Sequence, residues 1–345
     1  MRPDPDALLN WYDRHRRAMP WRDSGRDPYH VWLSEVMLQQ TTVATVGPRF
    51  RRFLEKFPTV AALAAAEDAA VMEEWAGLGY YARARNLLAG ARAVVALGGF
   101  PRSVEGLREL PGVGPYTAAA VGAIAFDLPV VPLDGNVERV MARVHAVREP
   151  LPGAKPRLAA LAQDSMQDAA ARARPGDFVQ ALFDLGATIC TPRTPACALC
   201  PWRGGCAAQA GGFAAELPAK AAKKDRPLRH GAHFLLKDAD GLVLVRRRPP
   251  KGLLGGMLEI PGTPWRDQPW GEAEALAHAP VAGLAWQRLP GLAQHGFTHF
   301  QLEMALYLAT VPRLVAPDGF EARPLDGLAP ALPTAMRRVL ALAGG

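Results

Sequence analysis

All four cysteines of this 345-residue chain lie within one short segment, and this clustering limits what the segment can fold around. A disulfide framework would distribute its cysteines along the chain, whereas clustered thiols in an intracellular protein indicate a metal site. The spacing is C-x6-C-x2-C-x5-C, in which a single Cys-x2-Cys pair is flanked by one cysteine on either side. Structural zinc sites usually contain two such pairs, so the sequence leaves both zinc and an iron–sulfur cluster open and departs from the usual zinc pattern. The four positions are Cys190, Cys197, Cys200 and Cys206.

Charge and hydrophobicity define the class of the chain. Forty Lys and Arg residues against 33 Asp and Glu residues give a net charge of +7, which suits a polyanion such as nucleic acid, with an ordinary basic surface as the alternative. No apolar run approaches the length of a membrane helix, and the first residues lack an apolar signal segment. We therefore expect a soluble intracellular protein of two domains, with no membrane partner.

The sequence divides into two parts of different character. Residues 1–212 are predicted to be helical, because segments such as 60–75 and 82–97 are rich in Ala, Leu, Glu and Arg with apolar residues at helical spacing. Residues 213–230 are basic and alanine-rich and contain two prolines, as expected of a linker. Residues 231–345 contain short strand-like runs, which predict an α+β domain.

A glycine-rich turn separates two helical stretches within about residues 104–124. In the sequence Leu-Pro-Gly-Val-Gly-Pro-Tyr-Thr, Gly112 and Gly114 permit a tight turn with exposed backbone N–H groups. A helix is predicted to begin directly after the turn, so its first N–H groups add to a site that can bind a DNA phosphate without reading base sequence. The segment is therefore interpreted as a helix–hairpin–helix, and a simple helix–helix connection is the alternative.

Glu35 is the first candidate for a catalytic acid. Asp27 and Pro28 are typical of a helix start, which places Glu35 about two turns inside the helix and too deep to cap it. Its neighbours one turn away are mostly apolar, so we expect burial to raise the pKa of its carboxyl and to favour a proton donor. An exposed glutamate on the polar side of the helix is the alternative.

Asp134 is the second candidate acid. It follows the apolar run 128–133, and Asn136 is predicted to cap a helix that begins at Val137. For Asp134 alone, an ordinary Asp-Gly turn is the stronger interpretation. Two acids nevertheless suit cleavage of a glycosidic bond, in which one protonates the leaving group and the other faces the cation-like sugar. A purine leaves readily only when a ring nitrogen is protonated, and the base must first be extracted from the duplex.

Together these motifs resemble those of the bacterial adenine DNA glycosylases, a family of the endonuclease III superfamily that acts on adenine opposite 8-oxoguanine. The cysteine spacing resembles the 4Fe-4S cluster loop of that superfamily, and the similarity extends over nearly the whole chain. The matching segments are Met19-Pro-Trp-Arg, Trp32-Leu-Ser-Glu-Val-Met-Leu-Gln-Gln-Thr, Gly77-Leu-Gly-Tyr-Tyr-Ala-Arg, Leu110-Pro-Gly-Val-Gly-Pro-Tyr-Thr, Val131-Pro-Leu-Asp-Gly-Asn-Val and Phe297-Thr-His.

The resemblance implies a role for each acid and for the cysteines. Glu35 is expected to protonate adenine and later to help activate water, and Asp134 to stabilise the sugar cation with Asn136 beside it. Tyr116 is expected near the reacting sugar. Related lyase-type enzymes have a lysine at this position, so hydrolysis without a Schiff base is expected here. The segment 190–206 is expected to hold a 4Fe-4S cluster with a structural and DNA-positioning role.

The resemblance also implies which side chains meet the DNA. Gln40 and Tyr80 are expected to wedge into the duplex around the lesion, with Tyr80 as a core aromatic residue being the alternative. Trp21 has the same alternative. Gln180 is similar to a position near the adenine, but Asp177-x-x-Gln180 also fits a helix capping box. The expected base-pocket residues are Trp21, Arg22 and Gln180.

Residues 231–345 resemble the Nudix-like domain that follows the catalytic half in this family. A working pyrophosphatase needs a helix dense in glutamates to hold metal ions, and residues 255–278 contain only Glu259, Glu272 and Glu274. We therefore expect a domain that reads 8-oxoguanine rather than one that hydrolyses nucleotides. For the segment 297–299, the alternative is the start of a core strand over residues 300–308. The expected lesion-reading residues are Phe297, Thr298 and His299, and Thr298 keeps the hydroxyl of the serine that many relatives have.

Two other functions are compatible with parts of the sequence. An endonuclease III-like glycosylase and lyase acting on oxidised pyrimidines would share the hairpin, the cluster and Asp134. A non-enzymatic iron–sulfur DNA-binding or redox-sensing protein would use the cysteines and the hairpin but would have no need of Glu35. The resemblance favours an adenine DNA glycosylase that binds double-stranded DNA carrying adenine paired with 8-oxoguanine or guanine, as a monomer in the bacterial cytoplasm, associated with the nucleoid through DNA.

Overall fold

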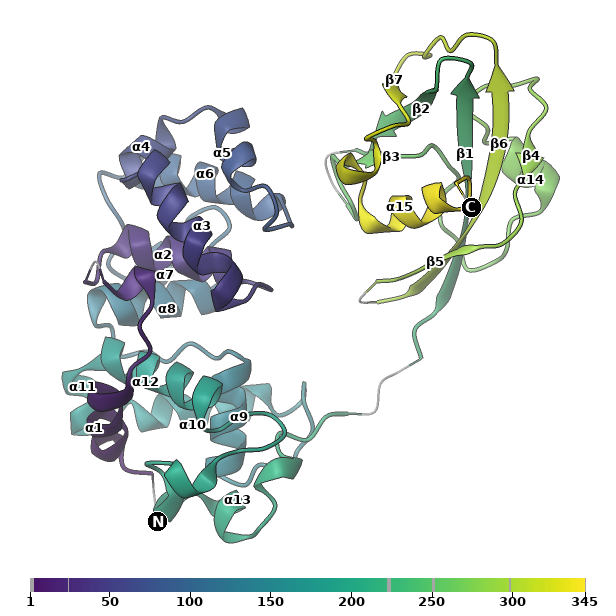
Figure 1. The fold of residues 1–345 in the computed structure, drawn as a ribbon. Coiled ribbons are helices and arrows are strands. Elements are labelled where there is room, and N and C mark those ends of the chain that lie inside the picture. Colours follow the sequence, from purple (N-terminus) through teal and green to yellow (C-terminus); the bar gives the residue numbers. More distant parts are fainter. Residues whose placement is uncertain (1–2, 24, 222–224, 250–251, 298, 345) are drawn as a thin grey trace. The chain divides into compact units, whose positions relative to one another are not determined.

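The computed structural model describes residues 3–23, 25–221, 225–249, 252–297 and 299–344. The chain forms two compact units, Met1–Ala222 and Lys223–Gly345 (Figure 1). Within the described ranges, no helix is both long enough and apolar enough to cross a membrane.

The first unit is built from helices, as the sequence predicts, although the stretch 60–75 forms two short helices instead of one. Its 3-10 helices are η1 (Pro20–Arg22), η2 (Cys197–Leu199), η3 (Arg203–Gly205) and η4 (Ala214–Glu216). Its α-helices are α1 (Pro5–His15), α2 (Pro28–Leu38), α3 (Val43–Lys56), α4 (Val60–Ala64), α5 (Asp68–Glu74), α6 (Ala82–Ala96), α7 (Val104–Arg108), α8 (Pro115–Phe126), α9 (Gly135–Val144), α10 (Lys155–Ser165), α11 (Ala169–Ala173), α12 (Pro175–Thr188) and α13 (Ala207–Ala210).

Helix α8 lies at the centre of this unit and packs against α2, α7 and α12. Its sequence, PYTAAAVGAIAF, is small and apolar on nearly every side, which suits a helix surrounded by other helices. The backbones of α8 and α12 approach closely, because a Cβ at Gly176 would lie 2.9 Å from the carbonyl oxygen of Ala123. This close packing fixes the relative positions of the helices that carry the candidate acids.

The glycine-rich turn joins α7 to α8. Gly112 has φ +76°, in the left-handed region that favours glycine, and a Cβ there would lie 2.5 Å from the Cβ of Asn86. Gly114 has φ −84° and caps α8, and a Cβ at this position would have no atom within 4 Å. The two glycines therefore differ, because the turn requires Gly112 for its conformation, whereas Gly114 leaves the helix N-terminus open.

The second unit is a mixed sheet with helices on both faces. Strands β1 and β6 run parallel along their whole length, from Leu228 opposite Gln301 to Asp238 opposite Val311. The strand order is β3-β2-β1-β6-β4, with β5 also paired to β6 and β7 to β2. The elements are β1 (Leu228–Asp238), β2 (Leu242–Arg247), β3 (Leu258–Glu259), α14 (Glu272–Leu276), β4 (Gln287–Arg288), β5 (Ala293–Gly296), β6 (Gln301–Val311), β7 (Phe320–Pro324), η5 (Ala329–Ala331) and α15 (Thr334–Ala341).

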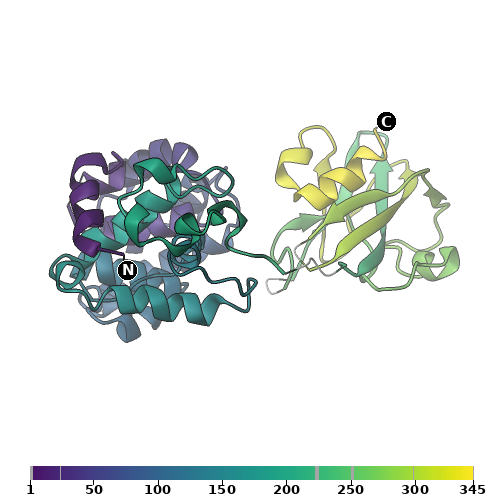
Figure 2. The same ribbon diagram turned by 90° about the horizontal axis from the view of Figure 1, so that it is seen from below.

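Alternation along the strands divides the core of this unit between the two faces of the sheet. Leu235 of β1 packs in the cluster that contains Met336 of α15, whereas its neighbour Phe234 packs with Ala275 of α14. Figure 2 shows these two helices on opposite sides of the sheet. The predicted α+β character of the second part is therefore present, with both faces covered.

The boundary between the units falls inside the predicted linker, residues 213–230. Residues up to 221 belong to the helical unit, because Leu217 is only 4% exposed in its core and Leu151 exchanges backbone hydrogen bonds with Ala219 and Ala221. Strand β1 begins at 228, before the predicted domain start at 231. Composition indicates a linker because the segment is basic and alanine-rich, but Leu217 anchors its first half to the helical core.

The two glycines of the turn provide a matched test of its geometry. Gly112→Ala should lower the free energy of unfolding of the helical unit by about 1–3 kcal/mol, because alanine is disfavoured at this φ and collides with Asn86. Gly114→Ala should have a much smaller effect. Chemical denaturation followed by circular dichroism at a helical wavelength measures both, and equal destabilisation by the two variants would contradict the assignment.

Candidate active site

A cavity of about 790 Å³ opens within the helical unit. Its walls come from α1, η1, α2, α8, the start of α9 and α12, which bring together parts of the chain from Tyr12 to Ala187. It brings together all the residues that the sequence predicted for catalysis and for the base pocket. These are Trp21, Arg22, Glu35, Tyr116, Asp134, Asn136 and Gln180.

Glu35 is placed in this cavity by α2. The side chain of Asp27 caps the helix by accepting the backbone N–H of Tyr29 at 2.8 Å, and Pro28 is the first helical residue, as predicted. Glu35 is only 8% exposed. Burial, reinforced by the nearby negative charge of Asp134, raises the pKa of the Glu35 carboxyl to about 7. The expectation of a buried carboxyl with a raised pKa is confirmed.

Tyr116 forms the direct contact with this acid. Its hydroxyl donates a hydrogen bond to Oε2 of Glu35 over 2.9 Å, from the first turn of α8. The bond favours the ionised form of Glu35 and so opposes the effect of burial on its pKa. Burial and the neighbouring carboxyls raise the pKa of Tyr116 well above its usual range, which keeps the phenol a donor. The sequence placed both residues in the site but did not show that they bond to each other.

Asp134, rather than Asn136, caps α9, which corrects the sequence-based prediction. Oδ1 of Asp134 accepts the backbone N–H groups of Asn136 at 2.9 Å and of Val137 at 2.7 Å. Oδ2 accepts the side-chain amide of Asn136 at 2.7 Å. The helix therefore begins at Gly135, earlier than the expected start at Val137. Burial raises the pKa of Asp134 while these three donors favour its anion, so the helix end stabilises a negative charge inside the cavity.

Arg22 and Trp21 form another part of the cavity wall. Arg22 donates two hydrogen bonds to the carboxylate of Asp184, at 2.8 and 3.0 Å, and Arg17 donates to the same carboxylate at 2.6 Å. Asp184 is fully buried on α12, and the sequence analysis missed it. The available signal is the single acid in the otherwise mostly apolar stretch FVQALFDLG, residues 178–186. Trp21 is 7% exposed and packs edge-on against Phe50, so it serves both the core and the cavity.

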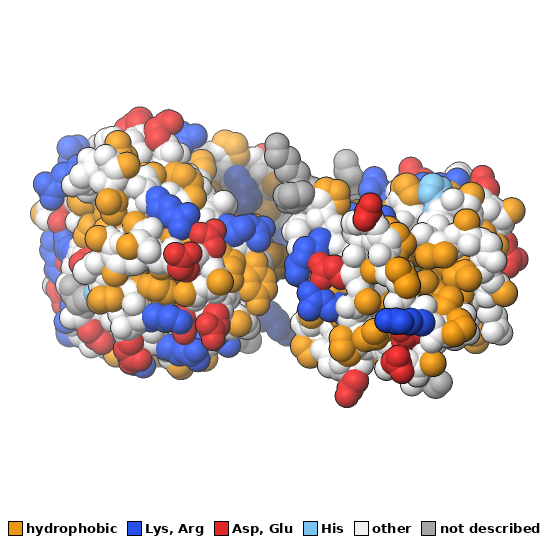
Figure 3. Space-filling view, turned by 90° about the horizontal axis from the view of Figure 1, so that it is seen from above, with side chains coloured by type: hydrophobic (Ala, Val, Ile, Leu, Met, Phe, Trp, Pro, Cys, Tyr) orange, Lys and Arg blue, Asp and Glu red, His pale blue; other side chains and the backbone are white. Residues whose placement is uncertain are grey.

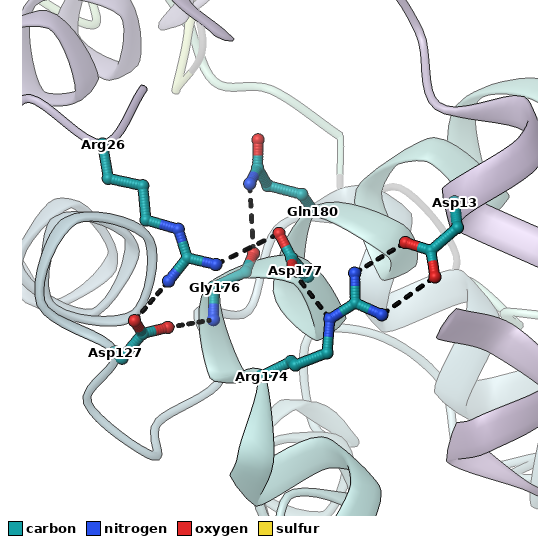
Figure 4. A network of polar contacts seen from close by, with 7 residues as sticks. All are labelled: Asp13, Arg26, Asp127, Arg174, Gly176, Asp177 and Gln180. Carbon is teal, nitrogen blue, oxygen red and sulfur yellow. Dashed lines mark hydrogen bonds and ion pairs between the residues drawn. The ribbon is translucent and has the colours of Figure 1, made fainter. Parts of the chain in front are cut away.

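Gln180 lies in the cavity wall, and the capping-box interpretation is wrong. Helix α12 begins at Pro175 and has no side-chain cap, and the amide of Gln180 donates back to the carbonyl of Gly176 at 3.2 Å. Figure 4 shows that Asp177 is bonded to Arg174 and Arg26 instead. Arg26 also pairs with Asp127, and Arg174 with Asp13. This network secures the residues around Gln180.

Gln40 and Tyr80 do not line the cavity but lie on exposed turns. Gln40 stands between Gln39 and Thr41, which both line it. Both candidate wedge residues have left-handed backbones, with φ 57° for Gln40 and 48° for Tyr80, and Tyr80 is 64% exposed. The alternative interpretation of Tyr80 as a core aromatic residue is therefore wrong. Non-glycine residues in this conformation are strained and concentrate at functional sites.

Surface charge gives little further guidance about the DNA-binding face. On the face of the helical unit seen in Figure 3, Lys and Arg side chains are interspersed with Asp and Glu. The hairpin that carries Gly112 and Gly114 offers backbone N–H groups at the start of α8 instead. Its geometry is compatible with phosphate binding by a helix N-terminus.

The four cysteines line a second cavity in the same unit, together with Arg143 and Trp202. None of them forms a disulfide. Four thiols around a shared apolar space fit an iron–sulfur cluster, which would supply iron–thiolate bonds that fix the loop. The ligands would be Cys190, Cys197, Cys200 and Cys206.

Two buried arginines of α9 bind the cysteine loop. Arg143 donates to the carbonyls of Thr191 and Pro192 at 2.7 and 2.8 Å and to Sγ of Cys190 at 3.3 Å. Arg139 donates to the carbonyl of Cys190 at 2.6 Å and to Oδ1 of Asn136 at 2.8 Å. One guanidinium thus connects the cysteine loop with the residue that bonds to Asp134.

In the second unit, Phe297 and His299, two of the predicted lesion-reading residues, lie between β5 and β6. Phe297 packs within an aromatic cluster, where its ring centroid lies 4.9 Å from that of Phe300 and 5.6 Å from that of Trp265, both at tilted angles. His299 is exposed, and Thr298 lies outside the described residues. The core strand β6 begins at Gln301, so this segment precedes the strand.

The acids that a pyrophosphatase would need have other partners. Both oxygens of Glu259 bind arginines, Arg246 at 2.7 Å and Arg248. Glu274 binds Arg266 and the backbone N–H of Gly271, which precedes the five-residue helix α14. The described part of this unit therefore contains no glutamate-dense helix and no group of acids arranged for a metal ion.

Comparison with protein families identifies both units. Residues 33–162 match the HhH-GPD superfamily of base excision DNA repair proteins, and residues 190–206 match the iron–sulfur binding domain of endonuclease III. Residues 232–342 match the NUDIX domain. These matches confirm the predicted fold classes and the predicted iron–sulfur cofactor.

Individual proteins give the same result. The adenine DNA glycosylase of Mus musculus is 36% identical over 90% of this chain and 72% of its own length. That of Mycolicibacterium smegmatis is 38% identical over 68% of this chain and 80% of its own length. Among solved structures, a thermostable thymine-DNA glycosylase has a TM-score of 0.53 and 29% identity, covering 60% of this chain and 95% of that one.

The cysteine loop makes a prediction about metal content. The purified protein should be brown and contain about four iron atoms per chain, because a 4Fe-4S cluster uses four thiolates. Cys200→Ser should lower the iron content and the visible absorbance together. Metal analysis by mass spectrometry measures this, and a colourless protein with one zinc ion would contradict it.

Proposed function

The chain belongs to the adenine DNA glycosylases, and on this premise we propose that it hydrolyses the N-glycosidic bond of adenine paired with 8-oxoguanine or guanine in duplex DNA. The observation that carries the proposal is a buried carboxyl, Glu35, whose pKa is raised to about 7 in a cavity that also holds Asp134. The comparisons with known proteins confirm the sequence resemblance to this family, and the roles of the individual residues are our proposals.

Glu35 supplies the proton that the leaving base needs. With a pKa of about 7, a large fraction of the carboxyl is protonated at neutral pH, which is the condition for an efficient general acid. The hydroxyl of Tyr116 occupies Oε2 and orients the group, leaving Oε1 for a ring nitrogen of adenine. After the transfer, the Glu35 carboxylate can accept a proton from the attacking water.

Asp134 stabilises the positive charge that develops on the sugar. Its carboxylate accepts three N–H donors at the N-terminus of α9, so it can remain an anion despite its burial. An anion in the same cavity as a protonated Glu35 gives the two acids different roles, as glycosidic cleavage requires. Asn136 holds the second oxygen and limits rotation of the carboxylate.

Hydrolysis rather than lyase chemistry fits the composition of the cavity. A lyase that acts through a Schiff base needs an amine nucleophile near the sugar. Tyr116 stands where the related lyases have lysine, and no lysine is among the described residues that line the cavity. This observation disfavours an endonuclease III-like lyase, and the buried acid disfavours a protein that only binds DNA.

The base must leave the duplex to reach Glu35. A cavity of about 790 Å³ accommodates an extruded nucleotide, and Trp21, Arg22 and Gln180 in its wall are our candidates for contacts with adenine. The exposed Gln40 and Tyr80 are our candidates for the side chains that fill the vacated space. The second unit is our candidate for reading the opposite 8-oxoguanine, through Phe297 and His299.

The central test is adenine release from defined mispairs. Under single-turnover conditions, the protein should release adenine opposite 8-oxoguanine, without a covalent adduct on borohydride reduction. Glu35→Gln should lower the rate by about two to four decades, the usual contribution of a general acid, while binding to the mispair stays close to wild type. The wild-type rate should fall as the pH rises above about 7, because Glu35 loses its proton, and should also fall in acid as Asp134 becomes protonated.

A substitution of Tyr12, which lines the same cavity, is a control for effects of altered cavity shape. Tyr12→Phe should preserve the alkaline limb of the pH profile. A Glu35→Gln rate within a few-fold of wild type would contradict the assignment of the acid. An efficient strand-cleaving activity coupled to base release would contradict hydrolysis.

Reading of the lesion makes a separate prediction. His299→Ala should weaken the preference for adenine opposite 8-oxoguanine over adenine opposite guanine, because an exposed side chain at the β5–β6 turn is removed without loss of core packing. Gln287→Ala, at an exposed position of β4, is a control on the same sheet. The measurement is the ratio of single-turnover rates on the two mispairs, and an unchanged ratio would contradict this role. The cluster absorbance should be unaffected.

A further inference from the structure

Arg83 binds two separate turns of the helical unit with one guanidinium. Its Nη1 donates to the carbonyls of Val36 and Met37, at 2.8 and 3.2 Å. Its Nη2 donates to the carbonyls of Leu78 and Gly79, at 2.9 and 3.3 Å. The first pair closes the end of α2, and the second pair lies in the turn before α6. Val36 and Met37 precede Arg83 by 47 and 46 residues, so the side chain connects segments that are distant in the sequence.

Each of these segments leads directly to a candidate wedge residue. Gln40 follows the end of α2, and Tyr80 follows Gly79. Both residues have positive φ, 57° and 48°, and both are exposed. A left-handed backbone at a non-glycine residue is strained and persists only where surrounding contacts impose it. Arg83 supplies such contacts to the last turn of α2, just before Gln40, and to the turn that leads to Tyr80.

The last carbonyls of a helix have no partners within the helix, and the fork of an arginine suits two of them at once. Arg83 satisfies Val36 and Met37 in this way at the end of α2. Its guanidinium also lies 5.3 Å from the ring of Trp75 and 5.7 Å from the ring of Tyr80. Trp75 in turn donates to the carbonyl of Gly79 at 3.1 Å. The turn before α6 is therefore held from two sides.

We propose that Arg83 is a positioning residue that holds Gln40 and Tyr80 in one fixed arrangement for extraction of the base from the duplex. Arg83 does not line the cavity, so it acts through the two turns and not on the reacting atoms. The inference rests on the proposed function, because it concerns the step that delivers adenine to Glu35. Arg83 is therefore proposed to affect extraction of the base from the duplex, but not cleavage of the glycosidic bond.

The test separates extraction from chemistry. Arg83→Met should slow single-turnover release of adenine from a stacked A:8-oxoguanine duplex by about 10- to 100-fold, the size expected for charged hydrogen bonds. On a duplex whose adenine is already unstacked, opposite an abasic analogue, the ratio of variant to wild-type rates should be close to one. A 2-aminopurine at the target position should show a smaller fluorescence increase on binding to the variant, because less of the base is unstacked.

Three further variants make the result specific. Arg83→Lys keeps the charge but not the fork, so it should recover only part of the lost rate. Arg85→Met removes an exposed positive charge from the same helix and should leave both rates unchanged. In a Gln40→Ala, Tyr80→Ala background, Arg83→Met should cause no further loss, because the side chains that it positions are absent.

The outcomes distinguish this inference from the function on which it rests. If wild type releases no adenine from the mispair, the proposed function fails. If wild type is active but Arg83→Met slows the stacked and unstacked substrates equally, or adds its full effect to the double variant, Arg83 is not a positioning residue for extraction. Thermal unfolding and the visible absorbance of the cluster identify a variant that is merely misfolded, and Arg83→Lys then decides the question.

Discussion

The helical unit depends on α9, because this helix carries the proposed catalytic carboxylate, Asp134, at one end and binds the cysteine loop along its side. Asp134 caps its N-terminus, and Arg139 and Arg143 project from its next turns into the interior. A buried guanidinium without partners would cost several kcal/mol, so the positions of its acceptors are tightly constrained. Most of the acceptors are backbone carbonyls, which belong to the cysteine loop, to Gly135 and Gly186, and to Leu217 near the end of the unit. The loop and the proposed catalytic carboxylate are therefore fixed to one rigid element.

The same unit favours the protonated form of one carboxyl and the anion of another, because the two lie at different positions on their helices. Glu35 lies in the middle of α2, where the hydroxyl of Tyr116 donates to it and burial dominates its pKa. Asp134 lies at a helix N-terminus, where three N–H donors favour its anion. The negative charge of Asp134 itself contributes to the raised pKa of Glu35. A protonated acid and an anion can thus coexist in one cavity at neutral pH.

Local features of the structure could be predicted from the sequence where a residue acts on its own segment. Asp27 and Pro28 predicted the start of α2, and the apolar neighbours of Glu35 predicted its burial. The helix caps were predicted wrongly where two nearby residues could both fill the same capping position. Asp134 and Asn136 are both good caps, and the choice depends on which backbone N–H groups are free. Asp177 and Gln180 fitted a capping box, but tertiary ion pairs with Arg174 and Arg26 engage the acid instead.

The contacts that organise the site are invisible in the sequence because their partners are distant. Arg17 and Asp184 are 167 positions apart, and Arg139 and Cys190 are 51 apart. An arginine in an amphipathic helix normally indicates a solvated side chain, and nothing in the local pattern of α9 distinguishes Arg139 from such a residue. The second unit also depends on contacts that the sequence does not show.

Glu259 is one of the few acids in a segment where a pyrophosphatase would carry metal ligands, yet its carboxylate is 2% exposed and bonded to Arg246 and Arg248. Arg248 lies 4.9 Å from the ring of Trp265, which packs against Phe297. Because its carboxylate anchors the arginine that supports the aromatic turn, Glu259 has a structural role in this fold that requires no metal ion.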